Sequence, residues 1–213
     1  MKYPRTYHIP SSPGSTSDDR FLDSVDQFLS KKIVITEKLD GSNTALTKDG
    51  VYGRSHADFT RNPWDQKTWE LWNVIKNDLS DGVYLFGEGM YGIHSLEYTN
   101  LDSYLYVFGV RDNGIWLSWD EVEEYSYILN IPTVPVLFTG VINSEKEFNN
   151  LISSLIKEES KLGSEREGVV IRTYDSFEND NFAYNVGKWV RKDHVKTTSH
   201  WSRDWKKAKL NND

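Results

Sequence analysis

The stretch ITEKLDGSNTAL, residues 35–46, places a lysine, an aspartate and a glycine between two runs of strand-forming residues. The run KIVITEKL (32–39) leads into it, and VYGRS (51–55) follows the pair Asp49-Gly50, a strong signal for a hairpin turn. Lys38 falls where the first predicted strand passes into DGSN. This lysine is either a charged residue on a surface strand beside an Asp-Gly turn or a nucleophile, and the stretch alone is compatible with both.

The composition indicates a folded protein and excludes several classes of site. The chain has 213 residues, of which 38% are apolar and 14% aromatic, so it can bury a core as one large domain or two small ones. It contains no cysteine, which excludes a disulfide scaffold and a thiolate metal site, and its five histidines lack a zinc-binding spacing. The sequence shows neither an apolar run of about 18 residues nor a signal-peptide core, so we expect a soluble, cytoplasmic protein.

Charge is unevenly distributed along the chain. The net charge is −7, yet residues 185–213 carry eight Lys or Arg against three Asp, a net of +5, which leaves −12 for residues 1–184. The acidic total argues against a nucleic-acid partner, because phosphate binding normally needs a basic surface. The basic end is either a solvated lysine-rich helix or a nucleic-acid surface in which Trp189, Trp201 and Trp205 interleave with lysine and arginine.

Periodicity and capping signals predict helices inserted between strands. The run DDRFLDSVDQFL (18–29) has helical spacing, and Asn62-Pro63 opens a second helix that ends near residue 80. Two Ser-x-x-Glu capping boxes, beginning at Ser118 and Ser144, start helices of roughly 10 to 15 residues. Several antiparallel strands with inserted helices predict an α+β fold. The remaining strand candidates are residues 83–89, 104–112, 113–118, 133–140, 166–174 and 182–192.

The pattern Lys-x-Asp-Gly at Lys38 gains meaning from the motifs that follow it. Alone it is weak, because a chain of this length contains it by chance roughly one time in ten. Six short motifs in order are far more specific. They are EKLDGSN (37–43), YGRS (52–55), LFGEG (85–89), YLYVFGVRD (104–112), REGVVIR (166–172) and VGKWVRKDHV (186–195).

This ordered set resembles the lysine-dependent nucleotidyltransferase superfamily of polynucleotide ligases and mRNA capping enzymes, and within it the RNA ligase 2 branch, from about residue 3 to 195. The resemblance implies an α+β antiparallel-sheet nucleotidyltransferase domain, of the ATP-grasp-like ligase type, over residues 1–213. It further implies an ATP-dependent RNA ligase that joins RNA 5′-phosphate and 3′-hydroxyl ends through a lysyl-AMP intermediate and an adenylated 5′ end. Mg²⁺ or Mn²⁺ would be the cofactor, and a repair partner or accessory domain would add grip on RNA.

The first motif would supply the nucleophile and its neighbours. A neutral lysine amine at pH 7 costs about 4.6 kcal/mol, so nearby cations, a metal ion or burial must lower the lysine pKa. The resemblance implies that Lys38 attacks the α-phosphate of ATP and that Glu37 lines the adenine pocket. It implies that Asn43 contributes to the later joining steps. Asp40 either orients the lysine, reaches a metal, or merely closes an Asx-turn ahead of Gly41.

The next three motifs imply contacts to the nucleotide. Arg54 would contact the ribose or a nucleic-acid phosphate, the alternative being a surface arginine at a strand end. Glu88 lies between two glycines, and the resemblance assigns it to the ribose hydroxyls. Phe108 matches the aromatic residue that stacks on adenine. Because Tyr104 and Tyr106 share its predicted strand face, a plain core role is the alternative.

The last two motifs would supply a metal ligand and positive charge. Glu167 precedes an apolar strand, where a buried carboxylate needs a partner, and the resemblance implies a divalent cation. Lys188 would stabilise charge on the α-phosphate and pyrophosphate. Ligases commonly carry a second lysine two positions later, where this chain has Val190. On an ideal strand Lys188 and Arg191 point to opposite faces, so a shared phosphate role for Arg191 needs a bulge or bend.

Other functions of the same superfamily fit the motifs less well. DNA ligases and capping guanylyltransferases usually add an oligonucleotide-binding barrel of about 80 to 100 residues after the last motif, whereas about 20 residues follow it here. We therefore expect no separate OB-fold domain. A non-catalytic nucleotide- or RNA-binding module of the same fold would not need Lys38 in particular. The RNA ligase is the function that these observations favour.

Overall fold

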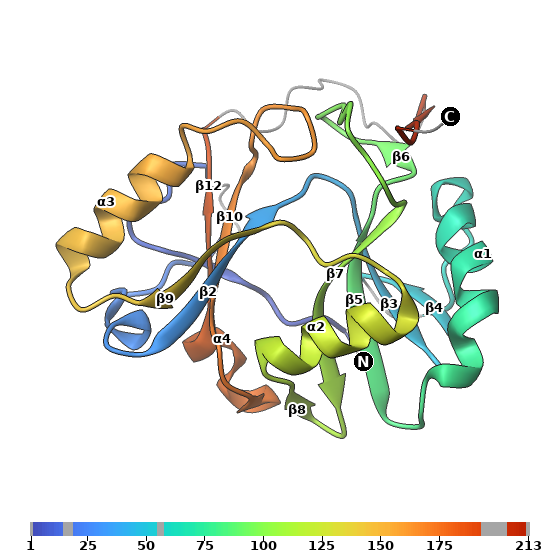
Figure 1. Ribbon diagram of the computed structural model, residues 1–213, viewed down its shortest axis with the longest axis horizontal. Helices are drawn as coiled ribbons and strands as arrows, with labels where there is room; N and C mark the ends of the chain where they lie inside the picture. The colour runs from blue at the N-terminus through green and yellow to red at the C-terminus, as the bar shows by residue number, and fades with distance from the viewer. Residues whose placement is uncertain (1, 15–18, 55–57, 193–203, 212–213) are drawn as a thin grey trace.

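The structure, a computed structural model, describes residues 2–14, 19–54, 58–192 and 204–211. Two β-sheets form the centre of the molecule, with helices along their outer sides (Figure 1). The mixture of largely antiparallel sheets and inserted helices confirms the predicted α+β fold.

The first sheet brings together segments from the start, middle and end of the chain. The register places Lys38 opposite Gly168 and Lys188 opposite Val170, so the two lysines flank one central strand. The N-terminal strand joins the edge in a parallel pairing, and the other pairs are antiparallel. The strand order is β1 (Tyr7–His8), β12 (Val186–Val190), β10 (Gly168–Thr173), β2 (Lys32–Lys38) and β9 (Val136–Val141).

The second sheet is antiparallel throughout. Its order is β11 (Phe177–Glu178), β8 (Ile115–Trp116), β7 (Leu105–Asp112), β5 (Val83–Gly89), β3 (Ser42–Thr47) and β4 (Gly50–Gly53). Asn43 lies opposite Glu88, and the register of β5 against β7 shifts between Phe86 and Gly87. A separate ribbon pairs β6 (Gly92–Ile93) with β13 (Lys206–Lys207).

The two predicted capping boxes both begin helices. The Ser118 side chain accepts from the Glu121 backbone N–H, and Glu121 Oε2 accepts from the Ser118 backbone N–H at 2.8 Å. Ser144 Oγ likewise accepts from the Glu147 N–H at 3.3 Å. No helix in the described ranges is long and apolar enough to cross a bilayer. The helices are α1 (Gln66–Ile75), α2 (Trp119–Leu129), α3 (Glu145–Leu155) and α4 (Phe182–Asn185), with 3-10 turns η1 (Asp26–Phe28), η2 (Pro63–Asp65), η3 (Lys76–Asp78) and η4 (Asn179–Asn181).

Three clusters of buried side chains hold these layers together. One joins the first sheet to α3, where the rings of Phe28 and Phe148 stack with centroids 6.2 Å apart. A second packs α1 and α2 on the second sheet. The third is aromatic and includes Phe86, Trp116 and Phe182, with Tyr3 packed against it. The first sheet contains β1 from the beginning of the chain and β12 from its late part. The site described below therefore forms only when these distant segments pair.

The predicted helix over residues 18–29 is wrong except for the turn η1. Phe21 instead forms an isolated parallel bridge with His8. The His8 N–H donates to Arg20 O and the Leu22 N–H donates to His8 O, each at 2.7 Å. These backbone groups bond in a strand-like pattern, so the apolar spacing of the segment serves packing rather than a helix. The stretch before it contains β1.

The predicted strand boundaries need two further corrections. The Asp49-Gly50 turn connects β3 to β4, so residues 32–39 do not belong to that hairpin and their strand lies in the other sheet. Residues 182–192, expected as one strand, begin with the helical turn α4 before β12. Asn185 Nδ2 donates to Asn181 O at 2.9 Å, which fixes that turn.

Candidate active site

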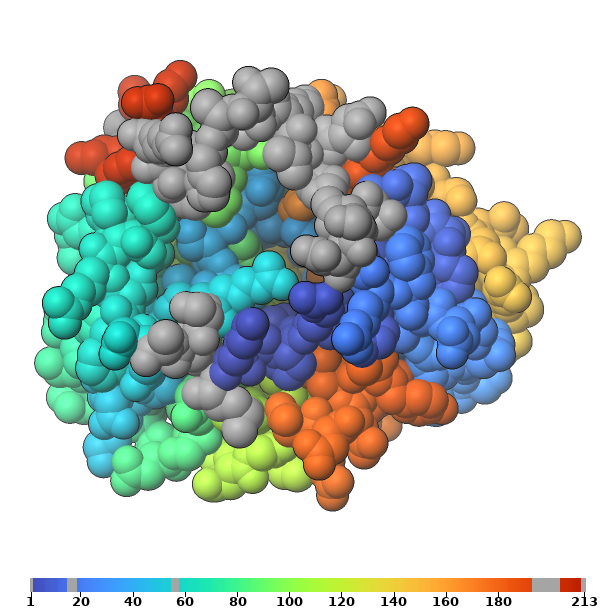
Figure 2. Space-filling view, turned by 180° about the vertical axis from the view of Figure 1, so that it is seen from behind, coloured from blue at the N-terminus to red at the C-terminus, as the bar shows by residue number. Residues whose placement is uncertain are grey.

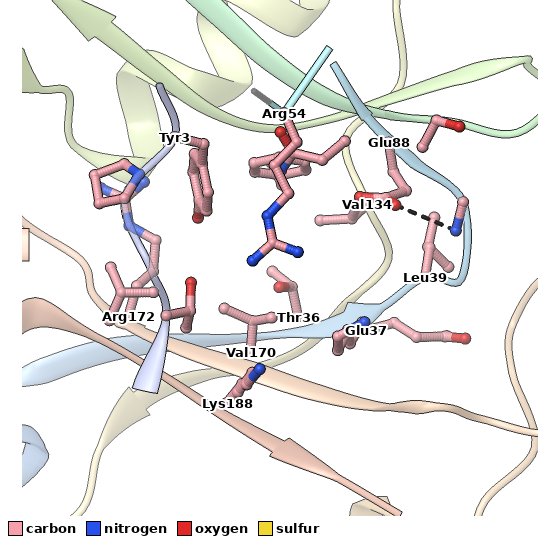
Figure 3. Close-up of a pocket in the computed structure, with 18 of the residues that line it drawn as sticks. Tyr3, Thr36, Glu37, Leu39, Arg54, Glu88, Val134, Val170, Arg172 and Lys188 are labelled. Atoms are coloured by element: carbon pink, nitrogen blue, oxygen red, sulfur yellow. Dashed lines mark hydrogen bonds between the residues drawn. The ribbon is translucent and has the colours of Figure 1, made fainter. Parts of the chain in front are cut away.

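A cavity of about 410 Å³ lies between the two sheets. One wall carries Glu37, Lys38 and Lys188 of the first sheet, and the other carries Asn43 and Glu88 of the second (Figure 3). Figure 2 shows this side of the molecule, where the N-terminal segment crosses in front between the late strands and residues near 60. The cavity thus collects most of the residues that the motifs singled out.

Lys38 ends β2 and forms an ion pair with Glu167. Its Nζ lies 2.7 Å from both Oε1 and Oε2 of Glu167, and the Glu167 side chain is only 5% exposed. Glu167 immediately precedes β10, whose first residue lies opposite Lys38 in the sheet. The pairing of β2 with β10 therefore brings together two residues that are 129 positions apart in the sequence.

The surrounding charges keep Lys38 protonated. Burial lowers the pKa of Lys38, but the carboxylates of Glu167, Glu88 and Asp40 outweigh it, so the net shift of the pKa is upward. This is opposite to the lowering that nucleophilic attack requires. The protein groups alone therefore hold the amine as an ammonium ion.

Glu88 faces the same end of the cavity and favours its protonated form. Burial raises the pKa of Glu88 to about 8; Lys38 opposes this shift, whereas Glu167 and Asp40 add to it. Glu88 Oε1 accepts from the Gly41 N–H at 3.2 Å, the bond dashed in Figure 3. A carboxyl group in this state can both donate and accept hydrogen bonds.

Asp40 connects the turn after Lys38 to the loop at residues 95–96 through hydrogen bonds. Its Oδ2 accepts from the backbone N–H groups of Ser95 at 2.8 Å and Leu96 at 2.9 Å, and its own N–H donates to Tyr98 Oη at 2.9 Å. These bonds fix the chain just beyond the lysine. Its predicted roles toward the lysine, a metal or an Asx-turn stay predictions.

Glu37 is a buried acceptor in the cavity wall. Its Oε2 accepts from the Lys161 N–H at 3.2 Å and lies 3.8 Å from Arg166 Nε. Within the described ranges, its buried Oε1 has no hydrogen-bond partner. Burial raises the pKa of Glu37, although hydrogen bonds from Ser160 and Lys161 oppose the shift. Such an atom is a ready acceptor for a ligand N–H, because leaving it unpaired costs free energy.

Asn43 offers a second acceptor on the opposite wall. Its Oδ1 is also buried and has no hydrogen-bond partner in the part of the chain that the structure describes. Asn43 and Glu88 form a cross-strand pair, so both side chains lie on one face of the second sheet. Each sheet thus contributes to the cavity lining one residue that has an unsatisfied acceptor.

Phe108 reaches the cavity because of a bulge. Phe86 pairs with Gly109 and Gly87 pairs with Val107, which leaves Phe108 as the extra residue of β7. Strict alternation would point Phe108 away from the face that Gly109 occupies, and a bulge redirects it. Its ring lies 5.3 Å from that of Tyr3, and both line the cavity.

The two tyrosines that precede Phe108 have a different place. Tyr106 is 2% exposed and its hydroxyl group contacts Asp102 and Ser103. Tyr104 packs against the core cluster of the second sheet and donates its hydroxyl to Ala208 O at 3.3 Å. Neither tyrosine lines the cavity, so only Phe108 of the three shares a surface with the candidate nucleotide site.

Arg54 and Lys188 make one side of the cavity positive. Arg54 follows β4, and its guanidinium group points into the cavity toward Lys188 (Figure 3). Lys188 Nζ lies 3.3 Å from Asp19 Oδ1. Burial lowers the pKa of Lys188 and the cations Lys38 and Arg54 lower it further, whereas Asp19 raises it. An anion such as a phosphate group would relieve this crowding of positive charge.

Arg191 and Trp189 lie apart from the candidate site. Arg191 follows the end of β12, forms an ion pair with Glu165, and is not among the residues that line the cavity. Trp189 is 9% exposed and its indole N–H donates to Ser11 O at 3.0 Å, which makes the predicted nucleic-acid contact of this residue wrong. Trp201 lies outside the described residues. The role of Arg191 toward the cofactor stays a prediction.

The carboxylates suit a cation that is held largely by other ligands. Among the described residues, no cluster of three or more His, Asp or Glu side chains is arranged to hold a metal ion. Mg²⁺ keeps several waters and binds one or two carboxylates together with phosphate oxygens, so it does not need such a cluster. Glu167, buried beside the cavity and next to Glu88 and Asp40, fits that requirement.

Sequence reasoning missed Tyr3 and His94. The ring centroid of Tyr3, near the N-terminus, lies within 5.2 to 5.5 Å of those of four other aromatic rings, and Tyr3 lines the cavity. His94 lines it too, with Nε2 3.2 Å from Ser42 Oγ. Burial lowers the pKa of His94 to about 4, Asp40 opposes this shift and Lys38 adds to it. No local pattern in the sequence pointed to Tyr3 or to His94.

Comparison with known proteins agrees with this geometry. Residues 31–190 match the model of the RNA ligase family, described as RNA ligase. This match covers well over half of the chain, and the chain belongs to the RNA ligase family. No protein of curated function matches the sequence.

Solved RNA ligases share the fold. A variant of Naegleria gruberi RNA ligase with ATP and Mn is 19% identical, with a TM-score of 0.56 over 81% of this chain and 53% of that chain. A second variant of that ligase, with AMP and Mn, is 17% identical, with a TM-score of 0.58 over 92% and 57%. An archaeal ATP-dependent RNA ligase is 15% identical, with a TM-score of 0.60 over 89% and 48%. The chain therefore spans about half the length of these ligases, and at such identities the likeness shows the fold.

Proposed function

We propose that the chain is an ATP-dependent RNA ligase that joins 5′-phosphate and 3′-hydroxyl RNA ends through a lysyl-AMP intermediate on Lys38. Residues 1–213 would act as one nucleotidyltransferase domain. The observation that carries the proposal is the position of Lys38 in a cavity that holds a buried acceptor, Glu37, on one side and two cations, Arg54 and Lys188, on another. Membership of the RNA ligase family supports the same reading.

We infer one orientation for a nucleotide in the cavity. Phe108 of the second sheet and Val170 of the first both line the cavity, and a flat base would stack between them. Glu37 Oε1 would accept from the amino group of adenine, whereas guanine presents a carbonyl oxygen at the same position of the ring. Glu88 would bind the ribose hydroxyls. Lys188 and Arg54 would then neutralise the phosphates.

The first chemical step requires Lys38, whose side chain is 28% exposed, to lose a proton to solvent water. The neutral amine then attacks the α-phosphorus of ATP, an N–P bond forms, and the bond to the pyrophosphate oxygen breaks. Glu167 holds the amine 2.7 Å away in a fixed orientation, and Asp40 anchors the turn behind it. These carboxylates raise the lysine pKa. The positive charge of Lys188, which is coupled to Lys38, acts in the opposite direction and favours the neutral amine.

A divalent cation, Mg²⁺ or Mn²⁺, fits beside Glu167. Glu167 would hold the cation, which would supply positive charge to the phosphates, and a carboxylate shared in this way would raise the pKa of Lys38 less. The protein contributes a buried and oriented carboxylate to this arrangement.

The later steps return Lys38 to its free form. The 5′-phosphate oxygen of an RNA end attacks the phosphorus of lysyl-AMP, so the N–P bond breaks and a pyrophosphate linkage forms. The 3′-hydroxyl of the second end then attacks the RNA 5′-phosphorus, a phosphodiester bond forms and AMP leaves. Asn43, with its unsatisfied Oδ1 beside Glu88, would accept from a hydroxyl group in these steps.

Adenylylation tests the proposal directly. Wild-type protein incubated with α-labelled ATP and Mg²⁺ should retain label, and proteolysis should locate AMP on the peptide that contains Lys38. Lys38→Arg keeps the positive charge beside Glu167 but removes the nucleophile, and it should retain no label. Label that persists in this variant refutes the assignment. Label from GTP instead of ATP would indicate a capping-type activity, and joining of DNA but not RNA ends would indicate a DNA ligase.

A further inference from the structure

We propose that residues Trp64, Tyr91, Trp205, Lys206 and Lys207, called here the C-terminal platform, bind single-stranded RNA next to the reacting end. The inference deepens the proposed function and rests on it. The platform combines two half-buried indole rings, Trp64 and Trp205, and the buried ring of Tyr91 with two exposed lysines, and Trp64 connects it to the cavity. In Figure 2 the C-terminal residues lie beside the residues of the α1 region at one edge of this face.

Residues 206–211 are fixed to the body of the protein. Residues Lys206 and Lys207 pair with Ile93 and Gly92 of β6 in an antiparallel ribbon. The Ala208 N–H donates to Tyr91 O at 2.8 Å, and Ala208 is buried. The Asn211 N–H donates to Leu101 O at 2.8 Å. These bonds hold the backbone of the platform in place, so little ordering is needed when a ligand binds.

The aromatic residues link this ribbon to the cavity. Trp205 meets Trp64 with ring centroids 6.3 Å apart at 72° and meets Tyr91 at 5.6 Å and 62°. Trp64 itself lines the cavity, and His94, the residue after β6, lines it as well. A base stacked on this cluster would therefore belong to a nucleotide adjacent to the one in the cavity.

The platform is basic on an acidic protein. Lys206, Lys207 and Lys209 are exposed, against one neighbouring Asp204, whereas the whole chain carries a net charge of −7. Within residues 204–211 and the other described ranges, none of these three lysines has an ion-pair partner. Lys207 Nζ lies 5.8 Å from the centre of the Tyr91 ring. Unpaired cations beside aromatic rings are what a phosphate backbone with unstacked bases requires.

The combination favours a single strand over other partners. Lysines alone would suit any polyanion, including duplex RNA or an acidic peptide. Indole rings add affinity only where a base is unpaired and can leave its own stack, because the bases of a duplex already stack on each other. Because Trp64 lines the cavity, these rings would contact the unpaired nucleotides next to the reacting RNA end.

The test uses the full chain with two platform variants and one control. Trp205→Ala removes the stacking ring, and Lys206→Glu with Lys207→Glu reverses two exposed charges. Lys146→Glu with Lys157→Glu changes two exposed lysines on and just after α3, on the opposite side of the molecule (Figure 1). Each protein is assayed for adenylylation by ATP and for binding of a labelled 5′-phosphorylated single-stranded RNA by fluorescence anisotropy at several salt concentrations.

We expect the platform variants to separate the two readouts. Adenylylation should stay within twofold of wild type, because the platform does not touch the groups that react. Trp205→Ala should raise the Kd for single-stranded RNA about 5- to 150-fold, and Trp205→Phe should restore most of the affinity. The double lysine variant should make the plot of log binding constant against log salt concentration less steep by about 1.4, because each lost phosphate contact to a single strand reduces the steepness by about 0.7. The control should change neither.

Other results would overturn the inference. An unchanged RNA Kd and salt slope in the double lysine variant, whose side chains are exposed, would contradict the platform even if Trp205→Ala failed to fold. Equal affinity for poly-glutamate and for RNA, independent of Trp205, would indicate a protein-binding surface instead. If wild type binds RNA through the platform but does not become adenylylated, the proposed function fails while the binding surface stands.

Discussion

Glu88→Gln should remove a large part of the pH dependence of stability between pH 6 and pH 8. Burial raises the pKa of Glu88 from its ordinary 4.5 to about 8 in the folded protein. Unfolding therefore releases a proton anywhere between these values, and stability falls as pH rises through this window. The sign follows because the folded state binds more protons than the unfolded state.

The magnitude follows from the two pKa values. Between pH 6 and pH 8 the linkage relation gives a loss of about 2.3 kcal/mol of unfolding free energy for a group with these values. The Glu88 side chain is only partly buried, and its pKa also depends on the charges of Lys38 and Glu167. We therefore expect a smaller loss of unfolding free energy, about 1 to 2 kcal/mol. Glutamine cannot ionise, so the variant should lack this loss and should be more stable than wild type at pH 8.

Urea unfolding at pH 6, 7 and 8 measures the effect. The difference between wild type and Glu88→Gln should widen by about 1 to 2 kcal/mol as pH rises. Glu124→Gln, which neutralises an exposed carboxylate on α2, serves as the control and should run parallel to wild type. A constant difference across the three pH values for Glu88→Gln would refute the assignment of a high pKa to this carboxyl group.

Three further variants test other parts of the site. Glu37→Gln should reduce the preference for ATP over GTP in adenylylation about 5- to 30-fold, because an amide can also donate to a guanine carbonyl; an unchanged ratio would place Glu37 away from the base. Asp19→Asn should lower the pKa of Lys188 further and move the alkaline limb of the pH–adenylylation profile to lower pH, whereas an unshifted limb would separate this pair from the reaction. Tyr3→Ala should cost about 2 to 4 kcal/mol of unfolding free energy in urea titrations while Tyr3→Phe costs much less, and a small loss for alanine would contradict its packing role.

The Lys38–Glu167 pair gives the site its most consequential feature. It fixes the amine in a defined position, yet the same charge keeps it protonated. Positioning and activation are therefore supplied by different groups, and the second requires positive charge near the amine. Lys188 lies across the central strand in the place where it can provide that charge.

Local sequence was sufficient for much of the fold. The capping boxes at Ser118 and Ser144, the Asp49-Gly50 turn and the alternating strands depend on residues within a few positions of each other, so they were predicted correctly as elements. The prediction of a helix over residues 18–29 was wrong, because the backbone groups of Arg20 and Leu22 form hydrogen bonds with His8 instead of with residues of a helix. Apolar residues at helical spacing indicate which side chains are buried, but they do not fix the hydrogen bonds of the backbone.

The sequence by itself determined the family and the residues for which we predict chemistry: the order of the motifs pointed to Lys38, Glu88, Glu167 and Lys188, and residues 31–190 match the RNA ligase family. Only the tertiary structure decided how these groups act on one another. The pairing of β2 with β10 placed Glu167 against Lys38 and reversed the expected direction of the lysine pKa, while the bulge in β7 turned Phe108 into the cavity. Burial and electrostatics depend on which distant segments meet, and no local pattern contains that information.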